Sequence, residues 1–303
     1  MNRFGYACIN MNLRDKGIFN SRTMRKKTFL QKGLPYASQL VLKNVKDLLP
    51  IFNWNYKNNV KVFRISSEIT PWASEYELHD LPDYEEICHY LKLAGKYTKV
   101  IGQRVSFHPG QFNCLASEKD YVVENCIKDL EIHGKLFDLM GLDQNHWSKI
   151  NIHLGSTCGG NLQFAADNFN KNFQRLSPSV QSRLTVENDD KPAMFSTKFL
   201  YEKIYKVSGT PIVFDSHHFE LGPQDADYKS SFEMAYDSWP KGIRPTCHHS
   251  NGKKEYEDNT IRSKAAHSDY YYKQFDSCNK SVDVMLEAKC KEKALKKYIK
   301  DFC

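Results

Sequence analysis

Eight short apolar runs alternate along this chain with longer segments of helical periodicity, and most of the runs end in a polar or charged residue. The two clearest are Leu184–Val186, which ends at Glu187, and Ile212–Phe214, which ends at Asp215. Runs of this length and composition are typical of buried parallel strands. The pattern predicts strands at residues 3–10, 60–66, 103–108, 149–153, 183–188, 211–215, 243–248 and 282–287.

Helical periodicity occupies the intervals between the runs. Apolar residues recur at helical spacing in residues 38–58, 82–99, 118–140, 161–176, 196–207, 232–238 and 289–303. Pro50 is expected to break or kink the first of these helices. Residues 11–36 are polar and basic, and they predict a loop or a short surface helix.

Strict alternation of strands and helices predicts a parallel sheet, and eight repeats at this length predict a closed (β/α)8 TIM barrel. The alternative is an open doubly wound sheet, but no GxGxxG follows the first predicted strand. No low-complexity linker divides the repeats. We therefore expect one domain that spans residues 1–303.

The bulk composition narrows the class of protein. The 303 residues carry a formal net charge of +7, which suits a polyanionic partner without requiring one. The nine cysteines are scattered and include no CxxC pair, so we expect reduced thiols and no zinc ribbon. With neither a signal-peptide pattern nor a long apolar run, an intracellular, soluble and monomeric protein without a membrane span is expected.

The polar residues at the strand ends are the strongest functional signal. A barrel brings the carboxyl ends of all its strands to one rim, so these side chains must converge there. Imidazoles and carboxylates without thiolates suit Zn²⁺, Mn²⁺ or Fe²⁺ better than Mg²⁺ or Ca²⁺. The set exceeds the needs of one ion, and the alternative is a hydrogen-bonded polar rim. Its members are Asn10, His108, His153, Glu187, Asp215, His218, His248 and Glu287.

Paired metal ions support phosphoester hydrolysis, and metal-dependent isomerisation of a sugar is the competing chemistry. The third predicted strand runs into His108-Pro109-Gly110-Gln111-Phe112. The Pro-Gly turn is expected to push Gln111 and Phe112 beyond the rim, where an amide–aromatic pair can wedge into a base stack. The alternative is that Phe112 packs under a neighbouring loop. Tyr6 is either a core residue or a base-stacking platform.

Together these segments resemble the UV damage endonuclease family, a (β/α)8 relative of endonuclease IV in the xylose isomerase-like group. The resemblance includes His108-Pro109-Gly110-Gln111 and Asp215-Ser216-His217-His218. It extends in the family's order over residues 5–10, 63–67, 108–111, 153–155, 187–189, 215–218, 266–269 and 283–289.

The resemblance implies a repair nuclease that cuts duplex DNA immediately 5′ of UV photoproducts and also accepts abasic or distorted sites. It implies two or three divalent metal ions, usually Mn²⁺, with Zn²⁺ as another possibility. The metal ligands implied are His108, His153, Glu187, Asp215, His218, His248, His267 and Glu287. Among them, the catalytic residues are Glu187, Asp215, His248 and Glu287.

For DNA, the resemblance implies that Gln111 and Phe112 insert at the lesion, although the family often has Tyr at the second position. Tyr6 and Asn10 match residues that contact the displaced nucleotides. Basic residues of the polar stretch at residues 11–36, such as Arg22, Lys26 and Lys27, are expected to hold phosphates.

Two positions depart from the family's pattern. Glu75 replaces a ligand histidine, so it is a tentative metal ligand, and His79 is another candidate. Thr246 stands where some members carry a carboxylated lysine, and threonine cannot form that ligand. These departures keep two alternatives open beside the nuclease: a sugar isomerase or epimerase of the same barrel group, and a non-catalytic damage-binding protein.

Overall fold

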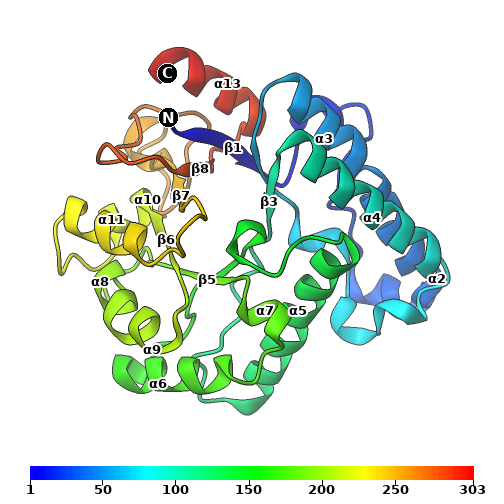
Figure 1. Cartoon of the computed structure of the whole chain (residues 1–303), viewed down its shortest axis with the longest axis horizontal. Helices are drawn as coiled ribbons and strands as arrows, with labels where there is room; N and C mark the ends of the chain where they lie inside the picture. Colours follow the sequence, from blue (N-terminus) through cyan, green and yellow to red (C-terminus); the bar gives the residue numbers. More distant parts are fainter.

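The computed structural model describes residues 1–303 and contains a single sheet of eight parallel strands, which lies inside a ring of helices (Figure 1). The strands follow the order β3-β2-β1-β8-β7-β6-β5-β4. Their bounds are β1 Arg3–Ala7, β2 Val62–Arg64, β3 Arg104–Ser106, β4 Ile150–Ile152, β5 Leu184–Glu187, β6 Ile212–Asp215, β7 Thr246–His249 and β8 Asp283–Leu286.

The two ends of this sheet meet between β3 and β4. Phe107, just after β3, forms a parallel bridge with Ile150 of β4. Its backbone N–H donates to Lys149 at 3.0 Å, and its carbonyl accepts from Asn151 at 3.0 Å. These bonds close the sheet, and the predicted TIM barrel is confirmed.

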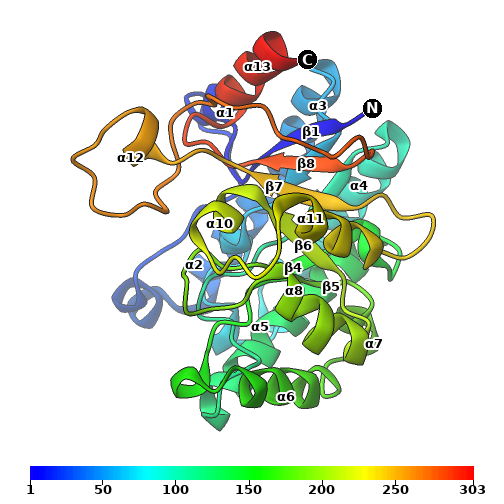
Figure 2. The ribbon, with the colours of Figure 1, turned by 90° about the vertical axis from the view of Figure 1, so that its left-hand side faces the viewer.

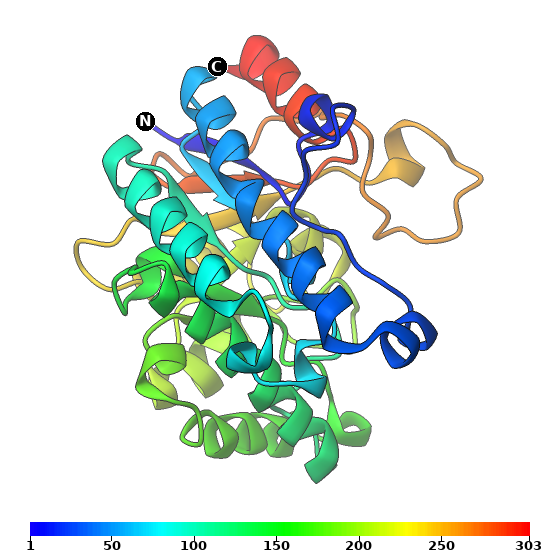
Figure 3. The ribbon, with the colours of Figure 1, turned by 90° about the vertical axis from the view of Figure 1, so that its right-hand side faces the viewer.

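The longer helices lie around the outside of the barrel (Figures 2 and 3). Their buried apolar residues belong to the core. In α4 the buried residues Ile87, Leu91 and Ala94 recur at helical spacing, and Gly102 ends the helix in the left-handed conformation. The α-helices are α1 Met11–Arg14, α2 Lys26–Lys46, α3 Leu48–Lys57, α4 Tyr84–Ile101, α5 Asp120–Leu139, α6 Leu162–Phe173, α7 Pro178–Gln181, α8 Thr197–Leu200, α9 Lys206–Ser208, α10 Ser216–Leu221, α11 Tyr228–Asp237, α12 Lys253–Tyr256 and α13 Lys291–Phe302.

Shorter turns complete the connections. They are the 3-10 turns η1 Ser67–Ile69, η2 Ala73–Glu75, η3 Leu78–Asp80, η4 His146–Ser148 and η5 Cys158–Gly160, and the π turn η6 Tyr201–Tyr205. No helix combines the length and the apolar character that crossing a membrane requires.

The first helical region differs from its prediction. The expected helix at residues 38–58 is two helices, and α2 begins inside the segment for which a loop or a short surface helix was expected. The first turns of α2, set off by the non-helical Gly33, agree with the short helix. The break lies at Asp47 and not at Pro50, which sits in the first turn of α3. Proline is tolerated there because the first turn has no intrahelical partner for its missing N–H.

A buried ion pair closes the amino-terminal end of the barrel. Arg104 Nη1 lies 3.0 Å from Asp283 Oδ2, and the two side chains are 1% and 0% exposed. The Arg104 guanidinium also lies 5.0 Å from the Trp147 ring centre and 5.2 Å from that of Trp239. Arg3 is a second partner of Asp283, at 2.6 Å. Arg244 is a third, at 3.9 Å, so the carboxylate offsets the charge of three guanidinium groups.

Asp283→Asn should destabilise the protein strongly, because it leaves the buried Arg104 charge without its anionic partner. We expect a loss of about 3–5 kcal/mol in the free energy of unfolding, measured by urea denaturation. The matched control is Asp143→Asn, which breaks an exposed 3.0 Å ion pair with Lys99 and should cost less than about 1 kcal/mol. Equal losses in the two variants would contradict this role for the buried pair.

Candidate metal centre

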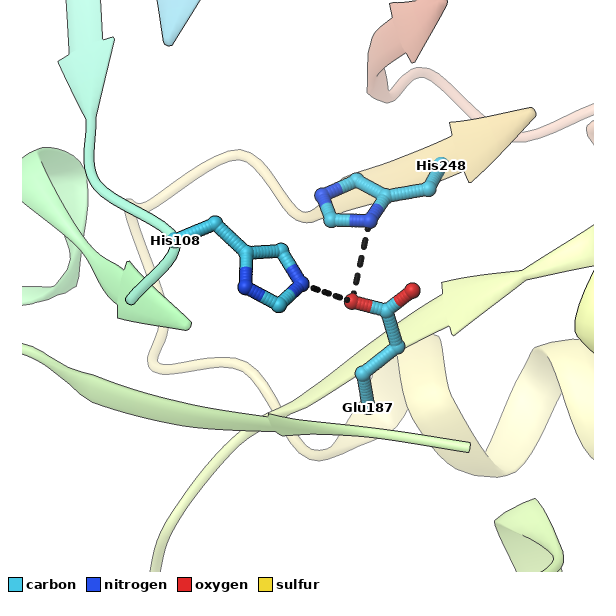
Figure 4. A group of neighbouring side chains, drawn as sticks. All are labelled: His108, Glu187 and His248. Carbon is cyan, nitrogen blue, oxygen red and sulfur yellow. Dashed lines mark hydrogen bonds and ion pairs between the residues drawn. The ribbon is translucent and has the colours of Figure 1, made fainter. Parts of the chain in front are cut away.

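Glu187 is the central residue of a cluster at the carboxyl ends of the strands. It ends β5 and its side chain is 1% exposed. One oxygen, Oε2, lies 3.1 Å from His108 Nε2 and 3.0 Å from His248 Nδ1 (Figure 4). The other, Oε1, lies 3.3 Å from His218 Nδ1. A single carboxylate thus faces three imidazoles from three different parts of the barrel.

The cluster contains three overlapping groups whose ligand atoms lie within 4.8 Å of one another. Glu187 belongs to two of these groups, and so does His248. Sharing of this kind is what a centre with more than one ion requires. The groups are His108, Glu187 and His248; His153, Glu187 and His218; and Asp215, His248 and Glu287.

Asp215 shows why these residues fit a cation. It ends β6 and caps α10, since its Oδ1 accepts from the backbone N–H groups of His217 and His218 at 2.8 Å each. Its Oδ2 is buried and has no hydrogen-bond partner. Its nearest charged partner, His218 Nδ1, is 4.0 Å away, and a buried carboxylate oxygen that accepts no hydrogen bond is costly unless a cation meets it. The orphaned oxygen points to a bound ion as that partner.

The imidazoles next to Glu187 differ in their proton affinity. Burial lowers the pKa of His108 to about 4, so this ring is a neutral ligand at ordinary pH. Burial acts in the same direction on His153. There the close ion-pair contact with Asp189, whose Oδ1 lies 3.0 Å from His153 Nδ1, and the charge of Glu187 outweigh it and raise the pKa to about 9. For Glu187 itself, burial is outweighed by the His248 charge and by the hydrogen bond from His108, and its pKa lies well below the usual range.

Two cations in the cluster were missed by the sequence analysis. Arg64, at the end of β2, contacts the Glu287 carboxylate, and its Nη2 lies 3.2 Å from His248 Nε2. Lys149, just before β4, is fully buried with Nζ 3.4 Å from the same nitrogen, and burial moves its pKa well below the ordinary value. The available signal was a single charged residue inside or beside an otherwise apolar run.

Polar residues also support the cluster from within the barrel. Asn151 donates to Glu187 Oε2, and its own Oδ1 accepts from Thr185 Oγ1 at 2.8 Å. These residues alternate along β4 and β5 with apolar ones that face the helices. The support holds the Glu187 carboxylate in one orientation.

The remaining predicted ligands lie outside the three groups. His267, in the loop before β8, is held by its Nδ1 at 2.8 Å from the Glu287 carbonyl oxygen. Glu75 is 43% exposed and pairs with Lys26 at 3.6 Å. The turn at Trp72, which has a φ of 59°, is followed by a 3-10 helix that leaves Glu75 at the surface. His79 is also exposed, and the three ligand groups include neither replacement candidate, whose role as a ligand stays a prediction.

The predicted DNA-contacting residues fall into two classes. Gln111 and Phe112 are exposed, Phe112 to 84%, beside a groove of about 660 Å³. Tyr6 and Asn10 are fully buried, and the Tyr6 hydroxyl accepts from Asn10 Nδ2 at 2.8 Å. Asn10 also caps α1 by accepting from the Leu13 N–H at 3.0 Å. Of the two interpretations of Tyr6, the structure shows the core residue, and its contact with nucleotides stays a prediction.

Comparison with known proteins places these observations in a family context. A model of the family described as UV-endonuclease UvdE matches residues 2–303. A UV-damage endonuclease from Schizosaccharomyces pombe is 34% identical over 97% of this chain, and the chain spans about half (49%) of that relative's length. A UV DNA damage endonuclease from Clostridium perfringens is 31% identical over 96% of this chain and 68% of its own.

Solved structures agree. SacUVDE has a TM-score of 0.83 at 28% identity, covering 99% of this chain and 97% of its own. Endonuclease IV from Thermus thermophilus has a TM-score of 0.56 at 12% identity, covering 98% of each chain. A 3-keto-D-glucoside 4-epimerase from E. coli has a TM-score of 0.55 at 8% identity, covering 99% of this chain and 98% of its own. The last two likenesses show the fold alone.

Glu187→Gln should weaken divalent metal binding, because it removes the charge that two of the ligand groups share. We expect the affinity for Mn²⁺ to fall by about 100-fold or more, measured by titration calorimetry and by elemental analysis after desalting. Glu75→Gln is the control and should keep the wild-type metal content. Metal loss in Glu75→Gln, with a normal circular dichroism spectrum, would show that Glu75 is a ligand after all.

In the metal-free protein, His153 should titrate near pH 9 and His108 should stay neutral down to about pH 4, as followed by NMR in chelator. Because the His153 pKa is raised, its ion pair stabilises the folded state fully below the unfolded pKa of about 6.5. That contribution is lost as the pH rises through about 9. Asp189→Asn should shift the His153 titration toward its ordinary value. An unshifted titration would show that Asp189 is not the cause.

Proposed function

Because the chain belongs to the UV-endonuclease UvdE family, we propose that it is a DNA repair endonuclease that hydrolyses the phosphodiester bond immediately 5′ of UV photoproducts in duplex DNA. Abasic and distorted sites are further substrates in this proposal. The observation that carries it is the set of three adjoining imidazole–carboxylate groups that share Glu187 and His248.

We further propose that these groups hold two or three divalent ions, with Mn²⁺ as the preferred ion and Zn²⁺ as the alternative. Ions held by these residues would supply Lewis-acid activation of water and neutralisation of charge on the phosphate. The ligands proposed are the seven residues of the three groups together with His267. Glu187, Asp215, His248 and Glu287 are the proposed catalytic members.

The chain's own residues orient this chemistry. Asn151 fixes Glu187 from inside the barrel, and the first turn of α10 fixes Asp215 through two backbone N–H groups. Arg64 contacts Glu287 and faces His248, so it adds positive charge at the edge of the site. Fixed charges of this kind stabilise an anionic transition state without reorganisation during the reaction.

Lesion recognition is proposed to depend on Gln111 and Phe112. Gln111 and Phe112 follow His108 by three and four residues, so the exposed pair and one proposed metal ligand lie on the same loop. An aromatic side chain that is 84% exposed makes few contacts within its own chain, and an aromatic wedge can insert where base stacking is weakened. A damaged dinucleotide costs less to unstack than an intact one.

The exposed pair Gln111 and Phe112 also argues against a sugar isomerase or epimerase, which would have no use for an aromatic residue outside a closed pocket. The three ligand groups argue against a purely damage-binding protein, since binding alone does not require them.

One hydrophobic cluster of 58 buried residues runs from Tyr6 to Tyr298 and supports the proposal of a single domain over residues 1–303.

The decisive experiment is a nicking assay on a duplex with one cyclobutane dimer. We expect a cut immediately 5′ of the dimer with Mn²⁺, none with chelator, and none with Glu187→Gln. Products are located on a sequencing gel beside size markers. Absence of a metal-dependent cut beside the dimer would refute the proposed activity.

Phe112→Ala should weaken lesion binding by about 1–3 kcal/mol, the usual value of a base–aromatic stack, measured by fluorescence anisotropy with the dimer duplex. Phe112→Tyr should retain the affinity because it keeps the ring. Phe164→Ala removes another exposed ring, on α6, and should have no effect. Equal effects of the two alanine variants would contradict a specific role for Phe112.

A further inference from the structure

His217 is a buried histidine whose imidazole has no hydrogen-bond partner within the barrel. It lies in the first turn of α10, between Asp215 and His218, and is 2% exposed. Neither of its ring nitrogens has a hydrogen-bond partner. Leaving a buried polar group unpaired costs about 1–3 kcal/mol, so a partner from outside the chain is expected.

A cavity of about 290 Å³ supplies the place for that partner. His217 forms part of its wall, opposite residues of the α12 segment. The wall also contains Gly252, where an added Cβ would lie only 3.3 Å from His217 Cε1. Glycine at this position lets the backbone approach the imidazole without a side chain between the ring and the cavity.

The cavity wall holds two lysines and two glutamates, and the two lysines are the ones free to meet an anion. Lys254 and Lys264 line the cavity and form no ion pair with a carboxylate. The acids in the wall, Glu220 and Glu255, both lie 3.8 Å from Lys273 Nζ. The lysines thus retain their positive charge for a ligand. Leu221 is the one apolar residue in the wall, so a nucleobase would find no stacking surface there.

The position of the cavity relates it to the metal centre. Its α12 side is anchored by a bridge between Gly252 and His267 and by the Lys253 N–H, which donates to the Ala266 carbonyl at 2.7 Å. The ring centres of His217 and His267 are 5.8 Å apart. Figures 2 and 3 show the α12 segment projecting from the same side of the molecule as the start of α2.

We propose that His217, Lys254 and Lys264 form a phosphate subsite that holds a backbone phosphate of the cleaved strand beside the bond to be cut. The N–H of one His217 ring nitrogen donates a hydrogen bond to a phosphate oxygen, and the two lysines neutralise the phosphate charge. A phosphodiester bound here would fix the register of the strand over the metal centre. This subsite rests on the proposed nuclease function, because it needs a nucleic-acid strand at that centre.

The test measures binding of the dimer duplex by fluorescence anisotropy over a range of KCl concentrations in chelator. Lys254→Met and Lys264→Met together should reduce the slope of log affinity against log salt by about 0.9, the value of the one phosphate contact, and each alone should give part of that change. His217→Leu should weaken binding by about tenfold or more. His217→Gln, which keeps an N–H donor, should recover part of that loss. Lys171→Met on α6 is the control: it is exposed and lies outside the cavity.

Three outcomes would overturn the subsite. Wild-type affinity and salt slope in His217→Leu and Lys264→Met, with the wild-type enzyme cutting the dimer duplex, would refute it and leave the nuclease proposal intact. A loss of Mn²⁺ content in His217→Leu, with unchanged DNA binding, would assign His217 to the metal centre instead. A wild-type protein that neither binds nor cuts the duplex would refute both proposals.

Discussion

The buried negative charge of Glu187 is the constraint around which the mouth of this barrel is arranged. A carboxylate with 1% exposure cannot stay ionised without compensation, and three imidazoles lie within 3.3 Å of its oxygens. The same requirement explains the amide of Asn151 below it and the polar lining of the neighbouring strands. At the carboxyl ends of the strands, convergent polar side chains that can act as ligands take the place of apolar packing.

Much of this arrangement follows from the sequence, because parallel strands in a barrel must end at one rim. His108, Glu187, Asp215 and His248 could be placed together from that rule alone. Side-chain direction inside a short apolar run could not, since it depends on register, and so Arg64 and Lys149 were missed. The exposure of Glu75 depends on the left-handed turn at Trp72, and the burial of Tyr6 depends on how α3 packs against the barrel. Neither is encoded in a local pattern.

The helix boundaries show the same division between local and distant causes. α4 could be predicted because its buried residues and its terminal Gly102 are local signals. The break between α2 and α3 at Asp47 could not, because Pro50 is compatible with the first turn of a helix. α10 was missed although Asp215 caps it, since the same acid had been interpreted only as a ligand.

Arg64 and Lys149 have a consequence for how the protein acquires its ions. Arg64 already contacts the Glu287 carboxylate, and Lys149 Nζ lies 3.4 Å from His248 Nε2, so Glu287 has a positive partner before any ion is bound. Loading an ion is then an exchange of one positive partner for another within a preformed frame. On the proposed function, the residues of the site would then keep their arrangement before an ion is bound.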